Sequence, residues 1–332
     1  GPEIALDHMA AIAPNQNHFE ASKLWCFYEI ETKGLEDLVI LCLPEDVAAY
    51  RAKYPFAMVL PIQMALRTLS ATGFNALMGV YKGRSPLYMR ELGKSLRALR
   101  SRGAATLQEL REAVAELGLS SEVKKLVQHR LDLIEPFMDE SVDLRSLLRP
   151  GRLIQIAIST AGLLPEDARL LAALLLDTLV LQDGGERCPL LLDLDEAHTL
   201  MDDSLLEQTV ETVLRRRRHL RTGVILCTHS PKALKKQHLA LLDSVALFRH
   251  DDLDSMKHLG EGLSIFRSLG VDKCAALPDG YAWFWAARYY PIDKNPKSIM
   301  SGDVISLLKI RPRASHHGGA TRRAVEDPPG SR

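Results

Sequence analysis

The chain has 332 residues, which is enough to bury one large or two ordinary hydrophobic cores. Its 42 lysines and arginines balance its 42 aspartates and glutamates, so the composition excludes a global basic field for nucleic acid, and any such contact must be local. The longest apolar stretch is too short to span a bilayer and the five cysteines have no CxxC spacing. We therefore expect a cytoplasmic protein with reduced thiols, no zinc site and no stable membrane insertion.

The first 60 residues contain one clear strand signal. A helix is expected at 20–29, and the apolar run at 38–43 is typical of a buried strand because Pro44 stops it. We predict that 1–60 forms the first, incomplete part of an α/β core.

Residues 61–148 have the apolar spacing of helices and few β-branched residues. Thr106 is followed three residues later by Glu109, which is a capping box at a helix start, and Gly118 fits the end of the same helix. This part is predicted to be a helical insertion.

Residues 149–313 alternate between apolar strands and helices. The predicted strands are 152–159, 189–194, 223–230 and 245–250, and the predicted helices are 166–182 and 204–218. Such alternation favours an α/β fold in which a mostly parallel sheet has helices on both faces. Segments 280–291 and 304–313 fit a closing antiparallel pair, and 314–332 is expected to be a disordered tail.

Two adjacent carboxylates, Asp195 and Glu196, follow the strand at 189–194. Ligands of open α/β sheets bind beyond the carboxyl ends of the strands, where one carboxylate can hold Mg²⁺ while its neighbour activates water for hydrolysis of a nucleoside triphosphate. A strand that merely ends in acidic loop residues would look the same. Thr228 and His229 favour the nucleotide site, because they end the next strand and can reach a γ-phosphate there.

Five arginines precede that next strand, namely Arg215, Arg216, Arg217, Arg218 and Arg221. Cations suit a helix C-terminus, so a solvated helix end is one interpretation. The other is that an arginine acts as a finger, stabilising phosphate charge in a neighbouring subunit's site.

The sequence lacks a phosphate-binding loop of the form GxxxxGK[ST]. Gly93, Lys94 and Ser95 supply the last three letters, but Tyr88 stands where the first glycine belongs and the surrounding spacing is helical. We predict that this triplet is a decoy, that is, a helical segment that does not bind phosphate. The KGRS stretch at 82–85 also fails, since it has arginine in place of lysine.

With these motifs, the chain resembles the HerA/FtsK superfamily of P-loop ATPases, especially HerA-type helicases and the conjugation ATPases of type IV secretion. The resemblance covers about 150–313 and rests on LLLDLDEAHTL, the helix and arginines after it, GVILCTHSP and LPDGYAW. It implies a RecA-like core, ATP and Mg²⁺ as cofactors, and a homo-oligomeric ring, such as a hexamer, that moves DNA. A nuclease or a secretion system is the implied further partner.

Matched position by position, the resemblance implies that Asp195 is the magnesium ligand and Glu196 the catalytic glutamate, with Thr228 toward the nucleotide. His229 stands where the family usually has a sensor glutamine, and Asp193 places a charge where the strand is normally apolar. For the arginine finger, the resemblance gives Arg215 and Arg218 without a choice between them.

Several alternatives remain open at this stage. The missing loop fits either a part of a longer ATPase or a degenerate member, and in both cases the chain alone should bind ATP poorly. The THSP motif also fits an ABC-type or overcoming-lysogenization-defect-like ATPase, although Gly184 and Gly185 abut the strand and leave no room for that class's signature helix. A third alternative is a non-catalytic interaction subunit. DNA or protein as substrate, the pathway and the ring size stay open.

Overall fold

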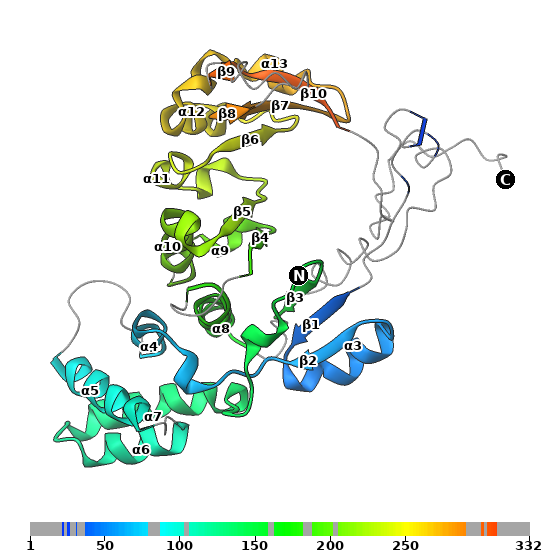
Figure 1. Ribbon diagram of the computed structural model, residues 1–332. Coiled ribbons are helices and arrows are strands. Elements are labelled where there is room, and N and C mark those ends of the chain that lie inside the picture. Colours follow the sequence, from blue (N-terminus) through cyan, green and yellow to red (C-terminus); the bar gives the residue numbers. More distant parts are fainter. Residues whose placement is uncertain are drawn as a thin grey trace. The chain divides into compact units, whose positions relative to one another are not determined.

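The computed structural model describes residues 22, 25–26, 31, 37–78, 87–102, 106–158, 163–181, 188–201, 205–289, 300–301 and 304–310 (Figure 1). The predicted tail at 314–332, the 82–85 stretch and the Gly184–Gly185 pair lie outside these residues, as does most of the predicted helix at 20–29. The chain divides into two compact units, one of residues 1–62, 151–162 and 311–332 and the other of residues 63–150 and 163–310. No helix in the described ranges is long and apolar enough to cross a membrane.

The first unit contains a three-stranded parallel sheet in the order β2-β1-β3. Its elements are β1 (Leu38–Cys42), η2 (Pro44–Asp46), α3 (Val47–Lys53), β2 (Met58–Pro61) and β3 (Leu153–Ala157). Every residue of β1, the central strand of this sheet, is buried. Tyr50 and Tyr54 of the α3 region pack against β1 in the core of this unit.

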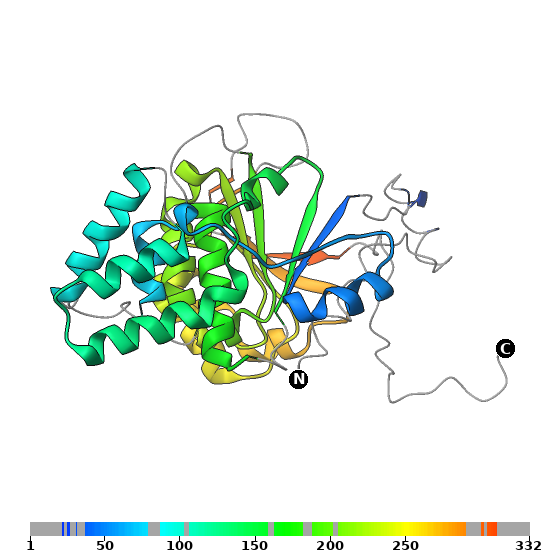
Figure 2. The ribbon, with the colours of Figure 1, turned by 90° about the horizontal axis from the view of Figure 1, so that it is seen from below.

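The described part of 63–150, which covers most of the segment predicted to be a helical insertion, lies in the second unit and is mostly helical. Its elements are η3 (Leu66–Thr68), α4 (Ala71–Leu77), α5 (Leu87–Ser101), α6 (Leu107–Glu116), α7 (Ser121–Ile134), η4 (Glu135–Phe137) and η5 (Leu144–Leu147). Seen from below, α5, α6 and α7 lie side by side (Figure 2). Gly93, Lys94 and Ser95 lie inside α5, where the backbone amides are used by the helix, so the GKS triplet is a decoy as predicted.

The predicted capping box at Thr106 is present at the start of α6. The Thr106 side chain accepts a hydrogen bond from the Glu109 amide at 3.2 Å, and the Thr106 amide donates to the Glu109 carboxylate at 3.0 Å. The Thr106 hydroxyl also donates to the Glu109 carboxylate at 2.8 Å, and the two bonds from the Thr106 amide and hydroxyl lower the pKa of Glu109 because they favour its charged form. Two amides that a helix start would otherwise leave unpaired are thereby satisfied.

We expect Thr106→Ala to destabilise the second unit by about 1 kcal/mol, because the substitution removes the N-cap acceptor. Urea unfolding followed by circular dichroism measures the change. Ser101→Ala is the matched control, since the Ser101 hydroxyl only donates to the Ala98 carbonyl within an exposed helix end. Equal midpoints for Thr106→Ala and the wild type would contradict the expected contribution of the cap.

A buried carboxylate joins the insertion to the next helix of the second unit. The predicted helix at 166–182 is α8 (Pro165–Leu176), continued as the π-helical turn η6 (Asp177–Leu181). Asp177 is 2% exposed and accepts hydrogen bonds from the Ser70 amide at 2.7 Å and the Ser70 hydroxyl at 2.5 Å. Gly73 permits this approach, because a Cβ there would come 2.4 Å from the carboxylate. The start of α4 is thus fixed on η6.

The strand that precedes the paired carboxylates forms a parallel pair with the next strand of the second unit. The two strands are β4 (Leu190–Leu194) and β5 (Thr222–Leu226), connected through α9 (Ala197–Leu200) and α10 (Leu205–Leu220). The helix α10 packs against β5 and α8 and lies alongside the strand pair in Figure 1. Buried apolar side chains, among them Val210 and Val213, form its inner face.

An antiparallel sheet in the order β10-β7-β6 completes the second unit, which confirms the predicted closing pair. Its strands are β6 (Ser244–Leu247), β7 (Tyr281–Ala286) and β10 (Ser306–Lys309), and a two-residue pair forms β8 (Arg288–Tyr289) and β9 (Met300–Ser301). Between β5 and β7 lie η7 (Pro231–Ala233), α11 (Lys236–Leu239), α12 (Leu253–Gly262), η8 (Ser264–Ser268) and α13 (Val271–Ala275).

A buried ionic cluster ties α11 to α10. Glu207 of α10 is 3% exposed and lies 2.8 Å from the Lys235 ammonium group. The His238 ring is fully buried, with Nε2 3.5 Å from Glu207 and 3.6 Å from Glu211. Because a buried carboxylate is stable only when it is paired, these contacts fix the position of the segment that follows β5.

Candidate active site

The carboxyl ends of β4 and β5 lie at one edge of the strand pair, because the two strands are parallel and in register from Leu190↔Thr222 to Leu194↔Leu226. Asp195 and Glu196 follow β4, and Thr228 and His229 follow β5 shortly afterwards. The structure brings Glu196 and His229 together, with 3.1 Å between Glu196 Oε1 and His229 Nε2. This distance places the segments that follow β4 and β5 in one candidate site.

The backbone of Glu196 is in the left-handed region, with φ 50° and ψ 41°. A non-glycine residue adopts this conformation only when its surroundings hold it there. The Glu196 amide donates to Asp195 Oδ1 at 3.0 Å, and the Ala197 amide donates to the Cys227 carbonyl at 2.8 Å. These bonds fix the turn between β4 and α9 and aim the Glu196 side chain.

A second histidine, which the sequence analysis did not single out, also faces Glu196. His198 Nδ1 lies 3.1 Å from Glu196 Oε2, so each carboxylate oxygen has one imidazole beside it. The His198 contact is a close approach without hydrogen-bond alignment. The centroids of the His198 and His229 rings lie 6.3 Å apart, and the two ring planes make an angle of 65°. The signal for this residue was the DEAH sequence itself, in which the histidine follows Glu196 by two positions on α9.

Negative charge is concentrated at the tip of β4. Although Asp193 is exposed, loss of hydration and the charge of Asp195 raise its pKa. The Cys227 thiol lies 3.9 Å from Asp193 Oδ1, and although Cys227 is exposed, partial loss of hydration and the charge of Asp193 raise its pKa. This cysteine is therefore a neutral thiol and a poor nucleophile.

Thr228 is predicted to face the nucleotide, but in the structure its hydroxyl forms the hydrogen bonds of a local turn. Its hydroxyl accepts a hydrogen bond from the Ser230 amide at 3.0 Å and lies 3.2 Å from the Ser230 carbonyl. The side chain therefore shapes the loop that presents His229. A direct contact from Thr228 to a nucleotide would require this turn to open.

The two finger candidates differ in their surroundings. Arg215 pairs with Glu211 at 2.7 Å, and this bond lowers the pKa of Glu211. Arg218 is exposed, and no side-chain partner for it occurs among the residues that the structure describes. Both precede β5, whose five residues span about 17 Å. His229 follows the other end of β5, so the two arginines are not part of the loop that carries the candidate site.

The residues present could hold a magnesium ion only together with the phosphates of a bound nucleotide. In the described ranges, no three His, Cys, Asp or Glu side chains are grouped so that they could hold a metal ion by themselves. Mg²⁺ usually keeps several waters and binds to one or two carboxylates together with substrate phosphates. Asp195, oriented by the Glu196 amide, fits that role.

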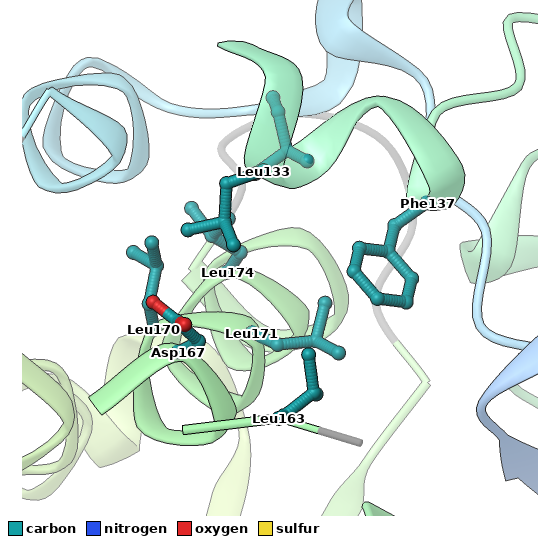
Figure 3. Close-up of a pocket in the computed structure, with 8 residues that line it drawn as sticks. Leu133, Phe137, Leu163, Asp167, Leu170, Leu171 and Leu174 are labelled. Carbon is teal, nitrogen blue, oxygen red and sulfur yellow. The ribbon is translucent and has the colours of Figure 1, made fainter. Parts of the chain in front are cut away.

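A small pocket in the second unit lies between α7 and α8 (Figure 3). It is lined by Leu133, Ile134, Phe137, Leu163, Asp167, Leu170, Leu171 and Leu174. The lining is apolar apart from Asp167, a carboxylate that would repel phosphate. This pocket does not suit a nucleoside triphosphate.

Comparison with solved structures identifies the architecture. The plasmid coupling protein TrwB in complex with the non-hydrolysable ATP analogue ADPNP matches with a TM-score of 0.50 at 12% identity, over 92% of this chain and 94% of TrwB. The chain has the TrwB fold. This agrees with the predicted RecA-like α/β fold and, at the level of fold, with the predicted resemblance.

Further matches accompany this one. TrwB in complex with ADP and Mg²⁺ gives a TM-score of 0.48 at 13% identity, over 92% of this chain and 95% of TrwB. VirB4 of Thermoanaerobacter pseudethanolicus gives 0.48 at 12% identity, over 89% of this chain and 87% of VirB4. No protein-family model matches the sequence, and no curated protein matches it.

Proposed function

We propose that this chain is the hydrolytic part of a HerA/FtsK-type ATPase that moves DNA, either as one part of a longer enzyme or as a degenerate subunit. The observation that carries the proposal is the meeting of Glu196 and His229 at the carboxyl ends of two parallel strands. Ligands of open α/β sheets bind at that edge. The TrwB fold supports the same assignment, because TrwB has been solved with an ATP analogue.

In this proposal, Glu196 accepts a proton from the attacking water, and His229 Nε2 lies 3.1 Å from one of its carboxylate oxygens. Asp195 would hold Mg²⁺, which supplies charge neutralisation for the phosphates when bound. His229 is positioned to contact the γ-phosphate because its side chain is 86% exposed at the tip of β5. Thr228 serves as the residue that presents His229 and, once its turn opens, contacts the nucleotide.

The arginine finger in this proposal is Arg218. A finger must reach out of its own subunit, and Arg218 is exposed and unpaired within the described residues, whereas Arg215 is held by Glu211. A finger acting between subunits implies a homo-oligomeric ring, such as a hexamer. We retain Arg215 as the second candidate, because its pair with Glu211 is exposed and inexpensive to break.

The finer assignments form part of the same proposal. They comprise a cytoplasmic location, an incomplete RecA-like part at 1–60, an insertion at 61–148, the Walker B and sensor strands at 149–313, and a nuclease or secretion system as partner. The second candidate function is a non-catalytic subunit that keeps the fold. The absence of GxxxxGK[ST] from the sequence favours this alternative, since phosphate binding needs the amides and lysine of such a loop.

Substitution of Glu196 tests the proposed function. In any extended or assembled form of the protein that turns over ATP, Glu196→Gln is expected to reduce kcat by about 10²–10⁴-fold, because general-base catalysis contributes that much. Nucleotide affinity is expected to stay unchanged, which equilibrium binding of a fluorescent ATP analogue measures. Glu122→Gln, an exposed acid on α7, is the control. An unchanged kcat in Glu196→Gln would favour the non-catalytic subunit.

A further inference from the structure

The Glu196 carboxylate is held between two histidines that differ in how firmly they are placed. His198 lies on α9, its side chain is 31% exposed, and its Nδ1 atom is buried against Glu196 Oε2. The His229 side chain is 86% exposed and contacts the other oxygen from the loop after β5. The first contact is a close approach of a buried ring nitrogen, and the second is made by an exposed side chain that a ligand can displace.

The backbone around His198 is anchored on both sides. Ala197 is fully buried and its amide donates to the Cys227 carbonyl, which fixes the start of α9 to the end of β5. The Thr199 amide and hydroxyl donate to the Glu196 carbonyl at 2.8 and 2.9 Å. His198 stands between these two anchored residues, so its backbone is held beside Glu196.

We propose that His198 is the residue that positions Glu196, and that His229 is the releasable partner. This inference rests on the proposed function and adds a positioning residue to it. When a γ-phosphate enters, the exposed His229 can turn toward it while His198 still holds the carboxylate in place for water. His229 can then contact the phosphate while Glu196 keeps the position that it needs as a general base.

The contact between His198 and Glu196 uses Nδ1, and this choice of atom provides a matched pair of variants. Asparagine places its amide nitrogen near the Nδ1 position of histidine, whereas glutamine places it near Nε2. His198→Asn should therefore keep the contact with Glu196, and His198→Gln should lose it at nearly equal bulk. For His229, whose contact uses Nε2, glutamine is the conservative replacement and alanine removes the contact.

The experiment records the side-chain carboxyl ¹³C signals of glutamate-labelled full chain without nucleotide. The signal that disappears in Glu196→Gln identifies Glu196, and the backbone amide spectrum verifies that each variant is folded. We expect the Glu196 signal to move in His198→Gln and to return close to its wild-type position in His198→Asn. We expect a smaller displacement in His229→Ala.

Three results would overturn the inference. These are a Glu196 signal that stays in place in both His198 variants, one that moves equally in both, and a larger displacement in His229→Ala than in His198→Gln. Because the measurement needs neither ATP nor metal, a failure of the proposed ATPase function would leave these results unaffected. The two hypotheses are therefore tested separately.

Discussion

ATP turnover by the purified 332-residue chain is expected to be undetectable. The end of β4 carries Asp193, Asp195 and Glu196, and loss of hydration together with the charge of Asp195 raises the pKa of Asp193. A triphosphate needs backbone amides and a lysine to offset this charge, and the sequence has no GxxxxGK[ST] loop to supply them. The carboxylates alone would repel the nucleotide.

Phosphate release in the presence of Mg²⁺ and ATP measures this turnover. Glu196→Gln is the control that separates turnover by the chain from that of a contaminating ATPase, because only the former depends on this carboxylate. Hydrolysis well above background that disappears in Glu196→Gln would contradict the expectation. Such a result would show that some other segment of the chain binds the phosphates.

In a form of the protein that turns over ATP, we expect Arg218→Ala to lower kcat on the order of 10³-fold or more, as is usual for arginine fingers. Arg215→Ala is expected to have a minor effect, because Arg215 forms an exposed pair with Glu211 and exposed pairs contribute little. Steady-state kinetics and equilibrium nucleotide binding measure the two effects. The Arg218 variant should still bind nucleotide, since the finger acts on the charge of the transition state.

Mixing inactive subunits provides the decisive control for the finger. Glu196→Gln and Arg218→Ala impair different subunits of one shared site, so a mixture of the two variants should recover part of the activity. No recovery, together with unchanged turnover in Arg218→Ala alone, would remove the finger assignment. A loss in Arg215→Ala instead would transfer the role to that residue.

Much of the fold could be predicted from the sequence where the apolar pattern is strong. The buried strand β1, the parallel pair β4 and β5, and α10 all follow from runs of apolar residues with one clear period. The strand β2 was missed because it has four residues and ends in Pro61, which is a weak strand signal. The helices α12 and α13 were missed as well, since each is short and partly exposed.

The candidate site could be predicted only in part. The positions of Asp195, Glu196 and His229 follow from where strands end, which a sequence shows well. The contact of His198 with Glu196 depends on the left-handed backbone of a glutamate, and no propensity predicts that conformation. The different surroundings of Arg215 and Arg218 depend on which of them lies one helical turn beyond Glu211.

The central claim is that Asp195 and Glu196 belong to a binding site for metal and nucleotide at the carboxyl ends of β4 and β5. In a form of the protein that turns over ATP, paramagnetic broadening of the amide signals by Mn²⁺ in the presence of ATP tests it most directly. We predict that broadening is strongest at Glu196, Cys227 and His229, and that Asp195→Asn removes it while Asp167→Asn, on α8, leaves it unchanged. Broadening that is centred elsewhere, or that persists in Asp195→Asn, would contradict the claim.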